Sequence, residues 1–220
     1  MRPYIPIGVV AHHHRLEYAN SLVEKVGAEV ISVDEVGRGA EWNHRLMLEW
    51  MSGGDQEWSV ILEDDAVPTK DFVSQLHRAL PWSPTPFVGL YLGRGRPPHW
   101  QAGISAVLAN DVCWMTCSTM MNAVGYAVKT KLITSIIRSL DATWSLIPSL
   151  PIDQAITKWG QGKIGVEFSY PKPSLVDHLD IAPVQKHDYG DPVEIRKAWT
   201  FGSREEWDGS SIPLEYVPSW

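Results

Sequence analysis

The chain has 220 residues, of which 44% are hydrophobic, and this length allows one compact domain with a sizeable core. Its formal net charge of −7 argues against broad electrostatic attraction to nucleic acid or to an anionic membrane. No apolar run reaches the length of a transmembrane helix and no signal-peptide pattern is visible, so we expect a cytoplasmic protein that does not insert into membranes.

Apolar runs and helical periodicities alternate along the chain, and this alternation is typical of an α/β fold. The predicted strands cover residues 5–11, 29–33, 58–62, 87–92, 123–128 and 164–168. Helices are predicted at residues 16–26, 40–51, 69–80 and 132–140, and another starts at Pro151. Thr69 is expected to cap the third helix. Trp42, Leu46 and Trp50, spaced four residues apart, are expected to form the buried face of the second.

Two stretches rich in glycine and proline interrupt this alternation. Residues 93–122 contain Trp100 and Trp114, and a long aromatic loop of this kind is expected to act as a lid over a site. Residues 191–220 are expected to wrap around the preceding domain, residues 1–190, or to fray from it.

The most informative motif is a run of three acids at the end of a predicted strand. Glu63, Asp64 and Asp65 directly follow the apolar residues 58–62. Crowded carboxylates repel one another, and Mg²⁺ or Mn²⁺ relieves that repulsion while also binding the oxygens of a phosphate. Capping of the next helix is the alternative, but a cap does not need three acids. The run therefore predicts metal-assisted chemistry on a phosphorylated substrate.

Three consecutive histidines, residues 12–14, follow the first predicted strand. They are a candidate metal cluster, but their position favours a loop beside a nucleotide site in which at most one imidazole takes part in chemistry. Ala11, His12 and Arg15 are accordingly expected to line the site of a nucleotide donor.

The sequence Leu62-Glu63-Asp64-Asp65-Ala66, followed by a proline and a predicted helix, resembles the D-x-D region of GT-A fold glycosyltransferases, in particular the lipopolysaccharide-type enzymes and small phage-encoded relatives. Four further stretches fit the family in the same order: residues 5–11, 31–34, 125–128 and 173–178. The resemblance implies a single-domain, Rossmann-like α/β/α sandwich with a mixed, mostly parallel central sheet. Glu63 stands where the family usually has an aspartate.

The resemblance also implies roles for individual residues. The metal, Mn²⁺ or Mg²⁺, would be bound by Asp65, Glu63 and His178, the last within an intact Pro-Ser-Leu-x-x-His stretch. The nucleotide-sugar donor would be contacted by Asp34, Asn43, Glu63 and Asp64. A turn or cap role explains Asp34 equally well. Asp153, in the first turn of the helix after Pro151, would deprotonate the acceptor hydroxyl.

These features predict a metal-dependent glycosyltransferase that moves a sugar from a nucleotide diphosphate sugar, with UDP-sugar favoured, to an acceptor hydroxyl. The acceptor would be a glycan, a protein or a modified nucleobase, although the net charge disfavours nucleic acid; a phage-encoded enzyme would act in the host cytoplasm. Trp100, Trp114 and Trp144 are expected to face the acceptor. One alternative is a nucleotidyltransferase of similar fold, which usually has a glycine-rich loop where residues 11–15 have none. The other, a non-enzymatic carbohydrate-binding protein, would not need three acids at a strand end.

Overall fold

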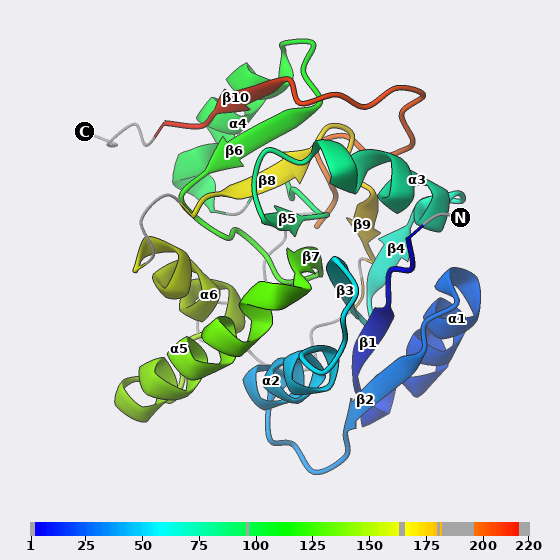
Figure 1. The fold of residues 1–220 in the computed structure, drawn as a ribbon, viewed down its shortest axis with the longest axis vertical. Coiled ribbons are helices and arrows are strands. Elements are labelled where there is room, and N and C mark those ends of the chain that lie inside the picture. Colours follow the sequence, from blue (N-terminus) through cyan, green and yellow to red (C-terminus); the bar gives the residue numbers. More distant parts are fainter. Residues whose placement is uncertain (1–2, 96, 163–165, 180, 182–195, 216–220) are drawn as a thin grey trace.

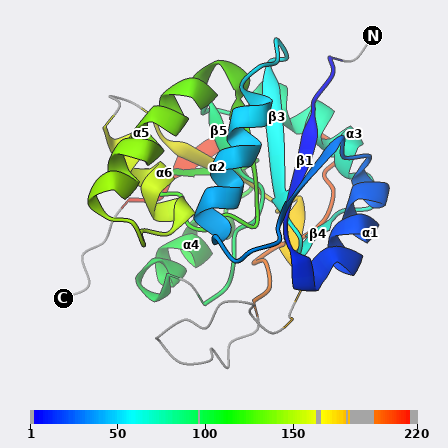
Figure 2. The same ribbon diagram turned by 90° about the horizontal axis from the view of Figure 1, so that it is seen from below.

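The computed structural model describes residues 3–95, 97–162, 166–179, 181 and 196–215, which form three layers with a sheet in the middle (Figures 1 and 2). Helices α1 (Leu16–Val26) and α3 (Phe72–Ala79) pack on one face of the sheet. Helices α2 (Ala40–Met51), α4 (Gln101–Leu108), α5 (Ile133–Leu146) and α6 (Ile152–Gln161) pack on the other. The predicted α/β/α sandwich is confirmed.

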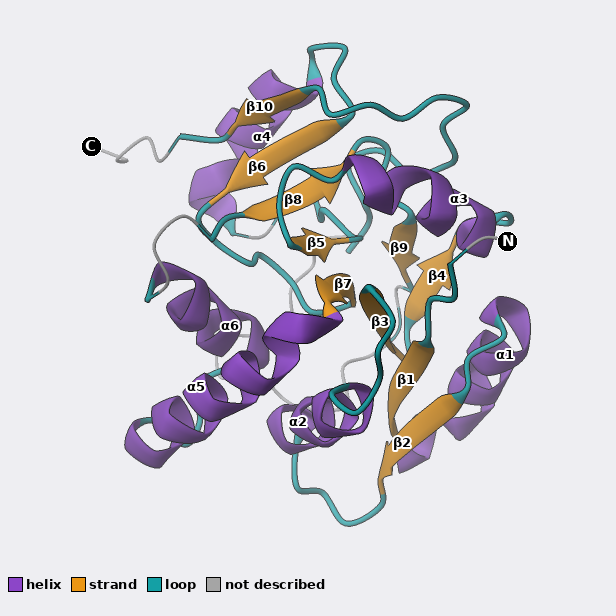
Figure 3. Cartoon of the chain, viewed as in Figure 1, coloured by secondary structure: helices purple, strands orange, loops and turns teal. Residues whose placement is uncertain are grey.

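The central sheet has eight strands in the order β10-β6-β8-β5-β7-β3-β1-β2 (Figure 3). Four of the seven neighbouring pairs are parallel and three are antiparallel, so the sheet is mixed with a small parallel majority. Its strands are β1 (Ile7–His12), β2 (Val30–Asp34), β3 (Trp58–Glu63), β5 (Phe87–Gly89), β6 (Trp114–Cys117), β7 (Gly125–Lys129), β8 (Phe168–Pro171) and β10 (Ser211–Pro213). A separate antiparallel pair, β4 (Ala66–Pro68) and β9 (Val176–His178), lies next to the acid run.

The sheet is buried on both faces because helices cover each of them, and successive side chains of a strand point to opposite sides. In β3, Ile61 packs with the α2, α5 and α6 side, whereas Val60 and Leu62 pack with α1 and α3. All three side chains are fully buried. Burial on both faces explains why this strand is a continuous apolar run in the sequence.

Short elements connect these layers. The 3₁₀ turns are η1 (His13–Arg15), η2 (Leu80–Trp82), η3 (Pro98–Trp100) and η4 (Thr130–Leu132). Helix α1 ends at Val26, as predicted, and is followed by Gly27, whose φ of 65° lies in the left-handed region and whose N–H donates to the carbonyl of Val23. None of the described helices is long and apolar enough to span a bilayer.

Several local predictions were wrong. In α2, Leu46 and Trp50 are 40% and 51% exposed, and the buried face consists of Asn43, His44, Met47, Leu48 and Met51. Thr69 does not cap α3, which begins after Asp71 and has no side-chain cap. The strand predicted at residues 164–168 begins only at Phe168; residues 163–165 lie outside the described part of the chain.

The prediction that residues 93–122 form a loop acting as a lid was also wrong. This stretch contains η3, α4 and strand β6 of the central sheet. Trp100 and Trp114 are buried in the core, and Trp144 lies on α5 and donates to the carbonyl of Leu150. Of these three side chains, none lines the pocket described below.

The described part of the C-terminal segment, residues 196–215, packs back onto the fold. Ala198 forms a bridge with Gly93, and β10 adds an edge strand beside β6. Trp207 is buried with its ring centroid 5.4 Å from that of Trp114. Residues 191–195 and 216–220 of the predicted tail lie outside the described residues.

Candidate functional site

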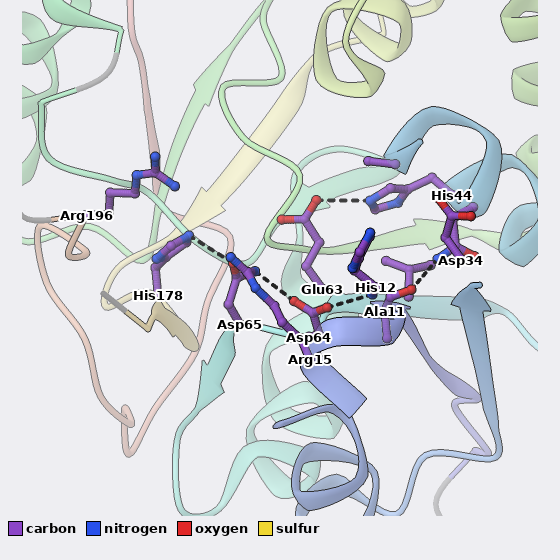
Figure 4. A pocket seen from close by; sticks show the side chains of 13 residues that line it. Ala11, His12, Arg15, Asp34, His44, Glu63, Asp64, Asp65, His178 and Arg196 are labelled. Atoms are coloured by element: carbon purple, nitrogen blue, oxygen red, sulfur yellow. Dashed lines mark hydrogen bonds and ion pairs between the residues drawn. The ribbon is translucent and has the colours of Figure 1, made fainter. Parts of the chain in front are cut away.

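A pocket of about 210 Å³ lies at the carboxyl ends of β1, β2 and β3, where open α/β sheets usually bind ligands (Figure 4). Its lining includes every residue predicted to contact the donor, namely Ala11, His12, Arg15, Asp34, Asn43, Glu63 and Asp64. It also includes the predicted metal ligands Asp65 and His178. The predicted base, Asp153, is not part of the lining.

Strand pairing explains how these residues meet. Strand β1 runs parallel to β2 and β3, with His12 opposite Asp34 and Val10 opposite Glu63. The antiparallel pairing of β4 with β9 places His178 opposite Ala66, next to Asp65. The N–H of Leu179 donates to the Asp65 carbonyl at 2.8 Å. The parallel strands therefore collect His12, Asp34 and Glu63, and the β4–β9 ladder brings the late histidine to the acid run.

Arg15 is the counter-charge for the second and third acids. Its Nη1 donates to Asp64 Oδ1 at 3.0 Å and to Asp65 Oδ2 at 2.6 Å, and the three side chains are at most 12% exposed. Burial raises the pKa of Asp65 to about 6, and the negative charge of Glu63 adds to this effect. Burial also raises the pKa of Asp64. One guanidinium thus does not fully offset the unfavourable free energy of burying these carboxylates next to one another.

Asp65 and His178 each carry a buried polar atom that the described residues leave without a hydrogen-bond partner. Nε2 of His178 lies 3.5 Å from Asp65 Oδ2. Asp65 Oδ1 and His178 Nδ1 have no hydrogen-bond partner among the described residues. Leaving one such atom unsatisfied costs about 1–3 kcal/mol, so each of these atoms is a candidate contact for a bound group. A carboxylate oxygen and an imidazole nitrogen are suitable donors for Mn²⁺.

Glu63 is held by a buried histidine that sequence reasoning did not select. His44 Nε2 lies 3.1 Å from Glu63 Oε1, and His44 Nδ1 lies 3.2 Å from the hydroxyl of Tyr126. Both contacts are satisfied if Tyr126 donates to Nδ1 and Nε2–H donates to Glu63. Burial disfavours ionised Glu63, but the hydrogen bond from His44 and the nearby positive charges lower its pKa. Glu63 is therefore kept ionised at the pocket, and Figure 4 shows the contact between its carboxylate and the His44 ring.

Two predicted donor-binding residues, Asp34 and Asn43, use most of their polar atoms in hydrogen bonds with the backbone. Asp34 accepts from the N–H groups of Val36, Arg38 and Gly39, which lowers its pKa despite burial and orders the loop before α2. The N–H of Gly37 adds to this effect, so the backbone of residues 36–39 surrounds the carboxylate. Asn43 donates to the carbonyls of Ala11 and Ser32 at 3.0 Å each and accepts from the Ser32 hydroxyl. Asn43 thus joins β1, β2 and α2 and shapes the pocket floor.

The histidines at residues 12–14 form a cluster whose first member, His12, lines the pocket. Their ring centroids lie 4.1–4.9 Å apart. Among the residues that the structure describes, they are the one group of three side chains with potential metal-ligand atoms within 4.8 Å of one another. His12 Nδ1 is already used, because it accepts from the N–H of His14. The backbone N–H of His12 donates to Asp64 at 2.8 Å, which ties this turn to the acid run.

Asp153 lies in the first turn of α6, as predicted. Its Oδ1 accepts from the N–H of Gln154 at 2.8 Å. Burial raises the pKa of Asp153 to about 6, and the charge of Glu63 also contributes. The carboxyl is therefore within electrostatic range of the pocket although it does not line it.

Arg196 is a second pocket residue that the sequence did not single out. It belongs to the C-terminal segment and lies at the same end of the pocket as His178, whereas Asp34 and His44 lie at the other end (Figure 4). Only long-range packing places it there, and no local motif marks it.

No protein-family model matches the sequence, and no curated protein matches it. Among solved structures, the chain is similar to the crystal structure of a glycosyltransferase involved in the glycosylation of the major capsid of PBCV-1. The TM-score is 0.43 at 9% identity, and the match covers 80% of this chain and 96% of that one. A similarity this low carries no argument about activity, so the function is argued from the pocket alone.

Proposed function

We propose that the protein is a glycosyltransferase that moves a sugar from a nucleotide diphosphate sugar, with UDP-sugar as the favoured donor, to an acceptor hydroxyl. The observation that carries the proposal is a pair of buried atoms in a pocket lined by acids, Asp65 Oδ1 and His178 Nδ1, which have no hydrogen-bond partner in the described part of the chain. Their position at the carboxyl ends of the strands is the usual place for a nucleotide in this architecture.

Asp65 and His178 are the proposed direct ligands of Mn²⁺ or Mg²⁺, with Glu63 or Asp64 reaching the ion through water or binding the ribose. When bound, such an ion offsets the negative charge that develops on the diphosphate leaving group. His44 orients Glu63 and keeps it ionised, whatever Glu63 contacts.

The donor is proposed to lie along the pocket with its nucleoside toward Asp34 and His12 and its diphosphate toward Asp65 and His178. The ionised carboxylate of Asp34 is the proposed acceptor for the imide N–H of uracil. Ala11 and Asn43 form the wall between these ends by joining β1 to β2 and α2.

Asp153 is the proposed general base for a reaction that inverts the sugar carbon. A base works best when its pKa lies near the working pH, and the pKa of Asp153 is raised to about 6. Asp153 would accept the proton of the acceptor hydroxyl as that hydroxyl attacks.

Donor turnover tests this proposal. The wild-type protein is incubated with a panel of UDP-sugars and Mn²⁺, and released UDP is measured with water or candidate glycans as acceptors. We expect UDP release that stops in EDTA and in Asp65→Asn but continues in Asp55→Asn, which changes an exposed aspartate outside the pocket. Release of pyrophosphate from a nucleoside triphosphate instead would identify a nucleotidyltransferase. Sugar binding without any nucleotide turnover would identify a carbohydrate-binding protein.

A further inference from the structure

We infer that Arg196 binds the sugar-linked phosphate of the donor's diphosphate and stabilises the leaving group. The inference rests on the proposed function and adds a phosphate-binding residue to it. Arginine suits this task because its planar guanidinium can donate two parallel hydrogen bonds to phosphate oxygens.

The position of Arg196 provides the first argument. Arg196 lines the pocket beside His178, at the end away from Asp34 (Figure 4). Tyr91 links the two residues: its ring centroid lies 6.0 Å from that of His178, and the charge of Arg196 acts on its hydroxyl. Arg196 therefore lies next to the proposed metal ligands, where the diphosphate would be.

The charge balance of the pocket provides the second argument. Four carboxylates line it, those of Asp34, Glu63, Asp64 and Asp65. Arg15 is ion-paired with two of these acids. Arg196 makes no hydrogen bond or ion pair with any residue that the structure describes. An arginine that lines an acidic pocket without pairing to its acids has its charge available for an anionic ligand.

The backbone next to Arg196 is firmly held, and this provides the third argument. Lys197 Nζ donates to the His178 carbonyl at 2.7 Å, and the N–H of Ala198 donates to Asp177 Oδ1 at 2.7 Å. The carbonyl of Lys197 also accepts from the N–H of Arg94 at 2.8 Å. These contacts attach the C-terminal segment to β9, the strand that carries His178. Arg196 and His178 are thus positioned together.

This arrangement has a chemical consequence. During transfer, the bond between the sugar carbon and the phosphate oxygen breaks and its electron pair stays on that oxygen. The acceptor oxygen forms the new bond to the sugar and gives its proton to the base. The diphosphate gains one negative charge in this step, and Arg196 would bind it more strongly as that charge develops.

Isothermal titration with UDP, UMP and inorganic pyrophosphate, each with Mn²⁺, tests the inference. We expect Arg196→Gln to weaken binding of UDP and pyrophosphate by about 10- to 100-fold and of UMP by less than about threefold. Arg196→Lys should fall between, because an ammonium retains the charge without the bidentate geometry. Melting temperatures should stay near the wild-type value, since Arg196 makes no hydrogen bond or ion pair with the residues that the structure describes.

The matched control is Arg94→Gln. Arg94 is an exposed arginine of the same region whose guanidinium donates to the Trp199 carbonyl and lies over the Trp199 ring, outside the pocket. It should bind UDP as the wild type does. Binding of UDP by Arg196→Gln within twofold of wild type, or equal weakening of UDP and UMP, overturns the inference while leaving the proposed function intact. Arginine-dependent pyrophosphate binding in a protein that turns over no nucleotide sugar supports the anion site and overturns the proposed function.

Discussion

Replacing Arg15 with glutamine tests the electrostatic description of the pocket most severely. Arg15 contacts Asp64 and Asp65 at 3.0 and 2.6 Å, and all three side chains are largely buried. Removing one partner of a buried ion pair typically costs about 3–5 kcal/mol, because the remaining charge stays buried without compensation. Protonation of Asp65, whose pKa is about 6 even beside Arg15, limits that cost.

The free energy of unfolding that Arg15→Gln loses should therefore depend on pH. An unfolded aspartate titrates near 3.9, so a folded pKa raised above that value makes stability fall as pH rises through the folded pKa. Without Arg15 the pKa of Asp65 rises further, and the fall extends to higher pH than in the wild type. We expect Arg15→Gln to lose about 3 kcal/mol of unfolding free energy at pH 8 and about 1 kcal/mol at pH 5, where Asp65 is mostly protonated in both proteins.

Urea denaturation at pH 5, 6, 7 and 8 provides the measurement, with Arg45→Gln as the control. Arg45 pairs with Asp141 and Glu49 on the surface, so its loss should cost at most about 1 kcal/mol and should not change between pH 6 and 8. An Arg15→Gln loss that is the same at pH 5 and pH 8, or no larger than that of the control, refutes this account of the acid run.

Three further variants separate the roles of the site residues. His178→Gln should need at least about tenfold more Mn²⁺ for half-maximal activity. It should melt near the wild-type temperature, because Nδ1 has no hydrogen-bond partner among the described residues. Lower stability with an unchanged Mn²⁺ requirement would instead make His178 structural. Asp153→Asn should lower kcat by about 100-fold or more and remove the rise of activity through pH 6 that ionisation of Asp153 produces, so an unchanged pH profile would exclude Asp153 as the base. His44→Gln should raise the pKa of Glu63, followed by carboxyl-carbon NMR in a pH titration, and an unchanged Glu63 pKa would show that His44 does not keep this carboxyl ionised.

Local sequence patterns were sufficient for the half of the fold that carries the acids. The strands and helices from β1 to β3 follow apolar runs and helical spacings, and each ends at a residue whose chemistry explains the end, such as Gly27 after α1. Parallel pairing of β1 with β2 and β3 then brings their carboxyl ends together, so Asp34, His12 and Glu63 meet as expected. Here secondary structure alone determines which side chains become neighbours.

Site residues that are positioned by long-range contacts could not be predicted from local patterns. His178 reaches Asp65 through the β4–β9 pairing, and Arg196 reaches the pocket because Lys197 and Ala198 attach its segment to β9. No periodicity encodes either pairing; family resemblance suggested His178, and no resemblance suggested Arg196. The stretch from 93 to 122 was misjudged because most of its glycines and prolines lie before α4, and Gly103, which lies within α4, does not break the helix.

His44 was missed for a different reason. Two stripes of α2 compete for the core, and the more apolar one, which contains Leu46 and Trp50, is largely exposed. The buried stripe carries Asn43 and His44, whose polar atoms all find partners on β1, β2, Glu63 and Tyr126. Hydrophobicity counts cannot anticipate a buried face whose cost is offset by hydrogen bonds to distant residues.

The claim that His178 binds the metal is tested most directly by electron spin-echo spectroscopy of Mn²⁺ bound together with UDP, which detects a coordinated imidazole nitrogen. We expect a nitrogen signal in the wild type that is lost in His178→Gln. The signal should be retained in His13→Gln, which changes the histidine cluster at residues 12–14. A signal that persists in His178→Gln and disappears in His13→Gln would contradict the account, because the metal would then lie at residues 12–14 instead of beside Asp65.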